Sequence, residues 1–166
     1  MTSKTKFQVV SQSDVPKDDV KVISSTESVV MVVDDEKIIA DTLSIILKRE
    51  GFSTITAYEA AGALNLAKLH KPDLIISDVM MPGMTGVQLA IAVTEMLPDC
   101  KILLFSGQAT TVDLLCEARK SGYNFTTLSK PVHPTDMLRR VKAYFPYKEF
   151  AGHAAESNTE GSHSLQ

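Results

Sequence analysis

The chain has 166 residues, of which 44% are hydrophobic, and this allows one ordinary globular domain with some polar sequence left over. Its formal net charge of −3, without a long basic run, argues against a nucleic-acid surface or an electrostatically held membrane protein. No apolar run approaches the roughly 20 residues of a membrane span, and the N-terminus lacks the apolar core of a signal peptide. We therefore expect a cytoplasmic protein with no membrane and no nucleic-acid partner.

The two cysteines, Cys100 and Cys116, are far apart and form no Cys-x-x-Cys pair. They are too few for a disulfide framework or a zinc site. We expect these thiols to be buried or inert, because free cysteine usually behaves as a small hydrophobic residue.

Regular patterning is confined to residues 29–146. Residues 1–28 are mostly polar with scattered valines, and residues 147–166 are small and polar; neither segment has helical or strand periodicity. We expect a flexible N-terminal extension, one domain and a disordered C-terminal tail.

Within the domain, short aliphatic runs alternate with amphipathic segments of about a dozen residues. The aliphatic runs predict strands at 29–33, 52–57, 74–77, 101–105 and 125–128. The amphipathic segments predict helices at 36–49, 59–69, 86–97, 110–120 and 134–144. Most strands are apolar throughout, as expected when both faces of a sheet are covered.

The first and last helices carry the clearest local signals. Gly51 follows the first helix, where a residue without a Cβ atom favours termination, and Pro134 occupies a first-turn position of the last. Their apolar stripes comprise Ile39, Leu43, Ile46 and Leu47 in the first helix, and Met137, Leu138, Val141 and Phe145 in the last.

A strict alternation of strands and helices with short loops predicts an α/β fold with a doubly wound parallel sheet and helices on both faces. In such folds, ligands bind at the carboxyl ends of the strands, near the point where the strand order reverses. The polar residues that end the strands are therefore the candidate site.

Charged and hydroxyl side chains stand at four of these strand ends. Asp34 and Asp35 end the first strand, Asp78 the third, Ser106 the fourth and Lys130 the fifth. Each has an ordinary explanation: Asp35 as a helix cap, Ser106 as a turn residue and Lys130 as a solvated charge. Together they predict a functional rim.

Three clustered carboxylates favour a bound cation, because two unit charges 4 Å apart repel by roughly 4 kcal/mol at an effective dielectric near 20. Mg²⁺ suits this set, since it takes oxygen ligands from one or two carboxylates and a phosphate. Lys130 and Ser106 can bind phosphoryl oxygens, and a carboxylate can attack phosphorus. Asp78, on the central strand, is the candidate nucleophile.

Four motifs occur in this order and element context. They are Val-Val-Asp-Asp-Glu at 32–36, Asp78 followed by Val-Met-Met-Pro-Gly-Met-Thr-Gly, Phe-Ser-Gly at 105–107, and Lys130-Pro131. In these motifs the chain resembles the receiver domain of two-component response regulators, over a span from about residue 29 to 145. The resemblance implies a flavodoxin-like sheet of five parallel strands in the order 2-1-3-4-5.

The resemblance also implies a site. Asp35, Asp78 and the backbone carbonyl of Met80 would hold Mg²⁺, and Asp34 would act through water. Lys130 and Ser106 would bind the phosphoryl oxygens on Asp78, and the peptide bond before Pro131 would be cis. The donor would be a phosphohistidine of a sensor histidine kinase or a histidine phosphotransfer protein.

One position departs from the common pattern of this family. An aromatic residue usually stands three positions before the lysine, whereas this chain has Thr127 there, with Tyr123 and Phe125 nearby. We therefore expect activation to shift the Ser106 loop and the fourth helix without an aromatic relay.

About twenty residues follow the last helix, so the sequence predicts a single-domain regulator that switches the binding of an unidentified downstream protein. We expect no enzyme activity beyond phosphoryl transfer to, and hydrolysis from, its own Asp78. One alternative is a receiver-like module that binds its partner without phosphorylation. The other, an acidic phosphatase, would usually carry a second acid two residues after its nucleophile, where this chain has Met80.

Overall fold

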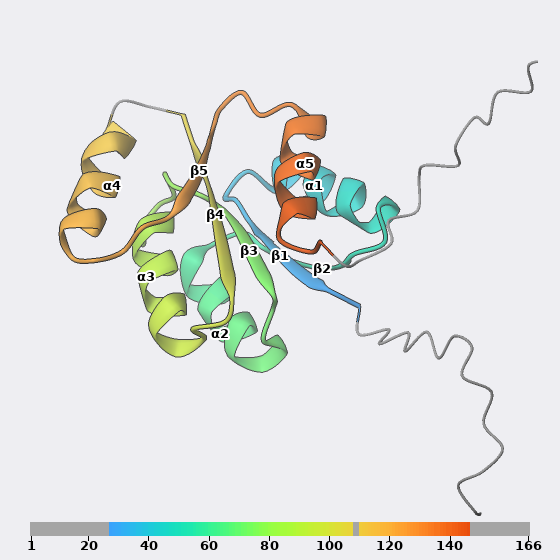
Figure 1. Ribbon diagram of the computed structural model, residues 1–166, viewed down its shortest axis with the longest axis horizontal. Coiled ribbons are helices and arrows are strands. Elements are labelled where there is room, and N and C mark those ends of the chain that lie inside the picture. The colour runs from blue at the N-terminus through green and yellow to red at the C-terminus, as the bar shows by residue number, and fades with distance from the viewer. Residues whose placement is uncertain (1–26, 108–109, 147–166) are drawn as a thin grey trace, which may run out of the picture.

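The computed structural model describes residues 27–107 and 110–146, which form a five-stranded parallel sheet with helices on both sides (Figure 1). The strands are β1 (Val29–Val33), β2 (Ser53–Ala57), β3 (Leu74–Asp78), β4 (Lys101–Ser106) and β5 (Thr126–Ser129). The helices are α1 (Lys37–Arg49), α2 (Ala60–His70), α3 (Gly86–Met96), α4 (Thr110–Lys120) and α5 (Pro134–Ala143). The strand order is β2-β1-β3-β4-β5, so the predicted doubly wound, flavodoxin-like α/β fold is confirmed.

Every predicted element is present, and each end lies within one residue of its predicted position. The differences in the strands follow from pairing with a neighbouring strand. Asp78 and Ser106 belong to strands because they pair with Phe105 and Ser129, and Phe125 lies outside β5 because pairing with β4 begins at Thr126. Residues 1–26 and 147–166, where the extension and tail were predicted, lie outside the described residues.

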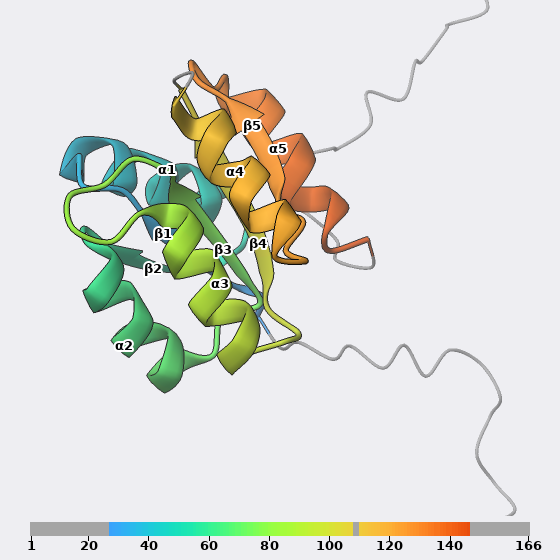
Figure 2. The same ribbon diagram turned by 90° about the vertical axis from the view of Figure 1, so that its left-hand side faces the viewer.

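The core consists of two apolar layers, one on each face of the sheet. Helices α1 and α5 cover one face, and α2, α3 and α4 cover the other (Figures 1 and 2). Side chains of β1 alternate between the layers: Val30 and Val32 face α1 and α5, and Met31 and Val33 face the opposite side. All four are at most 1% exposed, and burying such a side chain contributes about 1.5–3 kcal/mol.

The buried face of helix α1 is shifted by about one residue from the predicted apolar stripe. Its fully buried residues are Ala40, Ser44 and Leu47, whereas Leu43 and Ile46 are partly buried at the edge of the same layer. Ser44 is tolerated inside because its hydroxyl forms a 2.8 Å hydrogen bond with that of Thr56 on β2. The helix ends as predicted, with Gly51 at a φ of +84°, where other residues are strained.

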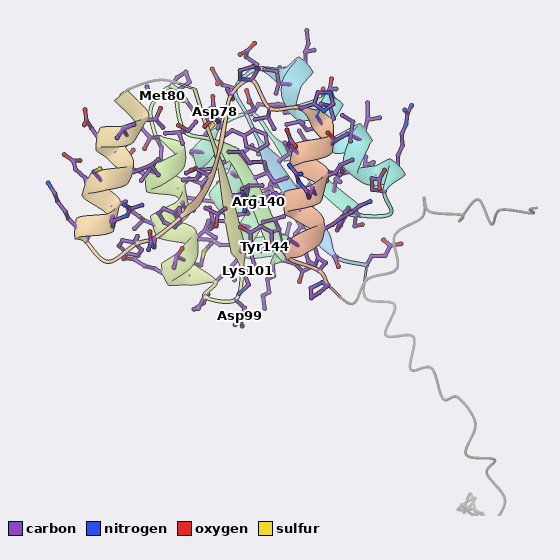
Figure 3. All side chains as sticks on the ribbon, turned by 45° about the horizontal axis from the view of Figure 1, so that its top comes forward. Asp78, Met80, Asp99, Lys101, Arg140 and Tyr144 are labelled. Carbon is purple, nitrogen blue, oxygen red and sulfur yellow. The ribbon has the colours of Figure 1, made fainter. Side chains whose placement is uncertain are left out.

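Helix α5 packs as its stripe predicted. Pro134 is its first residue, and Met137 and Val141 are fully buried against the sheet. At its end, the Tyr144 hydroxyl donates to the carbonyl oxygen of Ile102 on β4 at 3.4 Å. Figure 3 shows Tyr144 beside Lys101, at the end of the sheet remote from Asp78.

The two thiols lie in different surroundings. Cys100 is 9% exposed, and burial raises the pKa of its thiol to about 12, whereas Cys116 is exposed on α4. Among the described residues, no helix has both the length and the apolar character that crossing a membrane requires.

Candidate functional site

The register of the parallel strands brings the predicted polar residues to one edge of the sheet. Val33 of β1 pairs with Ser77 of β3, so the chain leaves β1 at Asp34 beside Asp78. Ser106 and Ser129 pair at the ends of β4 and β5, and Lys130 follows. Figure 3 shows Asp78 on this carboxyl rim.

Three carboxylates of the rim form a cluster. Asp34, Asp35 and Asp78 each offer one oxygen, and these atoms all lie within 4.8 Å of one another. Asp34 is buried at 2% exposure, Asp78 is partly buried and Asp35 is exposed. Such a set is open to solvent on one side and can hold a small divalent cation that keeps some of its water.

Lys130 supplies the opposite charge. Its Nζ lies 3.0 Å from Asp78 Oδ2 and 3.5 Å from Asp34 Oδ2. Its backbone N–H donates to the carbonyl oxygen of Ser106 at 2.7 Å, which fixes the chain after β5 to the end of β4. The Lys130-Pro131 peptide bond is cis, as the resemblance implied.

The pKa values of Asp34 and Lys130 are shifted by burial and by the charges of their neighbours in the cluster. Burial raises the pKa of Asp34 above its usual range, against a 2.9 Å hydrogen bond from the Glu36 N–H and the charge of Lys130. Burial lowers the pKa of Lys130, but its hydrogen bond and charge interaction with Asp78, and the charge of Asp34, raise it by more. Asp34 therefore carries a charge cost that a bound divalent cation would relieve, so the donor set fits Mg²⁺.

The remaining predicted site residues lie on the same rim. Ser106 is the last residue of β4 and is half-buried. Met80 follows Asp78 by two residues in the loop to α3 and is 41% exposed, and Figure 3 shows both at this edge of the molecule.

The aromatic residues near Thr127 are engaged elsewhere. Thr127 is exposed on β5, whereas the Tyr123 ring stacks on Phe125 with centroids 6.2 Å apart. The Tyr123 hydroxyl donates to Glu95 of α3 at 2.7 Å. Tyr123 is thereby held against α3, before the start of β5, rather than beside the carboxyl rim.

Two residues in contact with the Asp78 main chain were not predicted from the sequence. The buried Ser77 hydroxyl donates to the Asp78 carbonyl oxygen at 2.9 Å, and the first residue of α3, Gly86, lies directly against that carbonyl. A glycine at the first position of a helix is a signal of close approach, but the segment that it approaches is known only from the structure.

A parallel α/β sheet with three acids and a lysine at its carboxyl rim is the arrangement of a receiver domain. A family model described as the response regulator receiver domain matches residues 30–142, so the chain belongs to this family. Receiver domains in general bind Mg²⁺ at an acidic pocket and interact with kinases and downstream effectors.

Solved structures support this assignment. The chain is 30% identical to the chemotaxis response regulator CheY4 of Vibrio cholerae, with a TM-score of 0.62, over 72% of this chain and 99% of that one. It is 25% identical to a CheY-like receiver domain protein of Methanospirillum hungatei, with a TM-score of 0.67, over 73% and 95% of the two chains. NtrX of Brucella abortus, at 24% identity and a TM-score of 0.63, shares the fold over 72% of this chain and 27% of its own longer chain.

Proposed function

We propose that the chain is a response regulator that accepts a phosphoryl group on Asp78 and thereby changes its affinity for a downstream protein. The donor would be the phosphohistidine of a sensor histidine kinase or a histidine phosphotransfer protein. The observation that carries this proposal is the position of Lys130 Nζ, 3.0 Å from Asp78 Oδ2, beside a three-carboxylate cluster. The cytoplasmic location stays a prediction.

In this proposal, a carboxylate oxygen of Asp78 attacks phosphorus, a P–O bond forms, and the P–N bond to the donor histidine breaks. Asp35, Asp78 and the Met80 carbonyl would hold Mg²⁺, with Asp34 acting through water, and the ion would supply positive charge to the phosphoryl oxygens. Lys130 would exchange its ion pair with Asp78 for one with the phosphoryl group, and the Ser106 hydroxyl would donate to it. Hydrolysis of the acyl phosphate by water would reset the protein, with no other substrate turned over.

The conformational response is proposed to use the Ser106 loop and α4. Thr127 has no aromatic ring to change position, and the Tyr123 hydroxyl is bonded to Glu95. A pull on Ser106 by the phosphoryl group would instead shift the end of β4 and, with it, the position of α4. A partner that prefers one position of α4 would then bind the phosphorylated and unphosphorylated forms with different affinities.

The test is incubation with acetyl phosphate and Mg²⁺, followed by intact-mass measurement and treatment with hydroxylamine, which cleaves acyl phosphates. We expect a mass gain of one phosphoryl group that requires Mg²⁺ and is lost in Asp78→Asn. The matched control is Asp99→Asn, an exposed acid at the opposite end of the sheet (Figure 3), which should phosphorylate normally. No adduct on the wild-type protein would favour a receiver-like module that binds without phosphorylation.

A further inference from the structure

The Asp78 carbonyl is contacted by two residues. Ser77, which is 1% exposed, donates its hydroxyl to the carbonyl oxygen at 2.9 Å. Gly86 lies against the same carbonyl: a Cβ atom on this residue would be 1.9 Å from the carbonyl oxygen, 2.8 Å from the carbonyl carbon and 3.0 Å from the Ser77 hydroxyl oxygen. Any side chain at position 86 would therefore displace either β3 or α3.

The elements that flank this carbonyl group are themselves anchored. Thr85 caps α3, because its hydroxyl accepts from the Gln88 N–H at 3.2 Å and its own N–H donates to the Gln88 side chain at 2.9 Å. The Gly86 N–H donates to the Val79 carbonyl at 2.9 Å, which closes the loop that contains Met80. The Val79 N–H donates to the Phe105 carbonyl of β4 at 3.0 Å, so the main chain of Val79, which follows Asp78, is hydrogen-bonded to both α3 and β4.

We propose that Ser77 and Gly86 are positioning residues that set the direction of the Asp78 carboxylate and of the Met80 carbonyl. The inference rests on the proposed function, in which both groups are used. An aspartate side chain has only two rotatable bonds, so the orientation of its backbone largely determines where its oxygens lie. One Asp78 oxygen lies 3.0 Å from Lys130 Nζ in this state, and the proposed metal site needs one to stay within 4.8 Å of the other two acids, which leaves little freedom for the backbone.

The size of the effect follows from the required displacement. An added Cβ at 1.9 Å from an oxygen has to move by more than 1 Å to reach an ordinary contact. A misplacement of about 1 Å at a reacting group can lower a rate by about 100-fold. We therefore expect Gly86→Ala to slow phosphorylation by acetyl phosphate by about 100-fold, and Ser77→Ala, which removes one hydrogen bond and adds no atoms, by about fivefold.

Two further variants separate positioning from packing. Ser77→Cys fills the serine volume but donates only weakly, so it should resemble Ser77→Ala if the hydrogen bond is what matters. Gly62→Ala on α2 is the control for a helical glycine, because its Cβ would meet only the Glu59 side chain, at 3.4 Å. It should phosphorylate at the wild-type rate.

The measurements are the Mg²⁺ dissociation constant by calorimetry, the phosphorylation rate at low and saturating acetyl phosphate, and the amide NMR shifts of Val79 and Met80 without metal. We expect weaker Mg²⁺ binding, a lower saturating rate and shifted amide resonances in Ser77→Ala and Gly86→Ala. Urea unfolding checks that each variant is folded.

Wild-type values in folded Ser77→Ala, or full recovery of these values in Ser77→Cys, would overturn the proposal. If Gly86→Ala does not fold, Ser77→Ala decides the question. Failure of the wild-type protein to phosphorylate would instead overturn the proposed function, while the amide shifts still test the positioning.

Discussion

The candidate site is assembled from two parts of the sheet that differ in how deeply their residues are buried. Two of its acids follow β1 and the third ends β3, and residues 30–33 and 74–77 of these strands are at most 1% exposed. Its cation, Lys130, follows the edge strand β5, none of whose four residues is buried, and the Lys130 side chain is 27% exposed. We call these the acid half and the cation half of the site.

This difference suits the proposed function, in which the metal ligands would stay fixed while their counter-ion changes partner. Strands packed on both faces are the last to move, whereas an edge strand with few buried side chains deforms at low cost in free energy. The ion pair between Lys130 and Asp78 is partly exposed, and such pairs contribute little to stability, so it can be exchanged for a phosphoryl group. The two halves should therefore respond differently to substitution.

The largest effect is expected in the acid half, from Asp35→Asn. This change removes a charged oxygen ligand while the buried strands keep their packing, so we expect Mg²⁺ affinity and Mg²⁺-dependent phosphorylation to fall together, each by about 100-fold or more. Calorimetry with Mg²⁺ and intact-mass kinetics measure the two quantities. Undiminished Mg²⁺ affinity would remove Asp35 from the set of metal ligands.

The next largest effect is expected in the cation half, from Lys130→Met, which keeps the length of the side chain but not its charge. Phosphorylation should slow by about 10- to 100-fold, because one group that neutralises the phosphoryl oxygens is lost. Mg²⁺ affinity should stay the same or rise, since a positive charge 3.0 Å from Asp78 is gone. If Mg²⁺ binding falls as it does in Asp35→Asn, the two halves are not separable.

A smaller effect, on stability rather than chemistry, is expected from Asp34→Asn in the metal-free protein. Burial raises the pKa of Asp34, so the folded state binds the Asp34 proton more tightly than the unfolded state does. This tighter proton binding stabilises the folded protein at low pH, and the stabilisation is lost as pH rises through the raised pKa. The asparagine amide keeps an oxygen that can accept from the Glu36 N–H, but it carries no negative charge that is costly to bury. The variant should be more stable than wild type by roughly 1 kcal/mol at neutral pH.

The pH dependence gives this prediction its control. At pH values well below 3.8, the ordinary pKa of an aspartate, Asp34 is protonated in both the folded and the unfolded state, so the gain from Asp34→Asn should disappear. Urea unfolding with a chelator present measures both conditions, and Asp99→Asn, at an exposed acid, should change stability by less than about 0.5 kcal/mol. A gain that persists at low pH would have a cause other than the Asp34 charge.

The smallest effect is expected from Tyr123→Phe. This change removes the hydrogen bond to Glu95 but no group of either half, so the phosphorylation rate should stay within about twofold of wild type. The same mass-spectrometric time course measures it. A large change would show that the α3 contact of Tyr123 communicates with the rim and that an aromatic switch exists despite Thr127.

Sequence alone predicted the elements and the meeting of the polar residues, because both follow from local patterns and from the parallel topology. Asp34, Asp78 and Lys130 converge whenever strands of this order are in register. Sequence could not predict the buried Ser44, whose hydroxyl is satisfied by a residue on another strand, or the contact of Gly86 with Asp78. Both features depend on how closely segments distant in the sequence approach each other, and the periodicity of the sequence carries no information about that distance.

The surroundings of the two thiols have a practical consequence for following the proposed movement of α4. Burial raises the pKa of the Cys100 thiol to about 12, so a maleimide dye at neutral pH should react at Cys116, which is exposed on α4 itself. The chain has no tryptophan, so its intrinsic fluorescence is weak beside that of the dye. The natural sequence thus carries a single attachment point for a fluorescent reporter, and it lies on the helix whose displacement would signal phosphorylation.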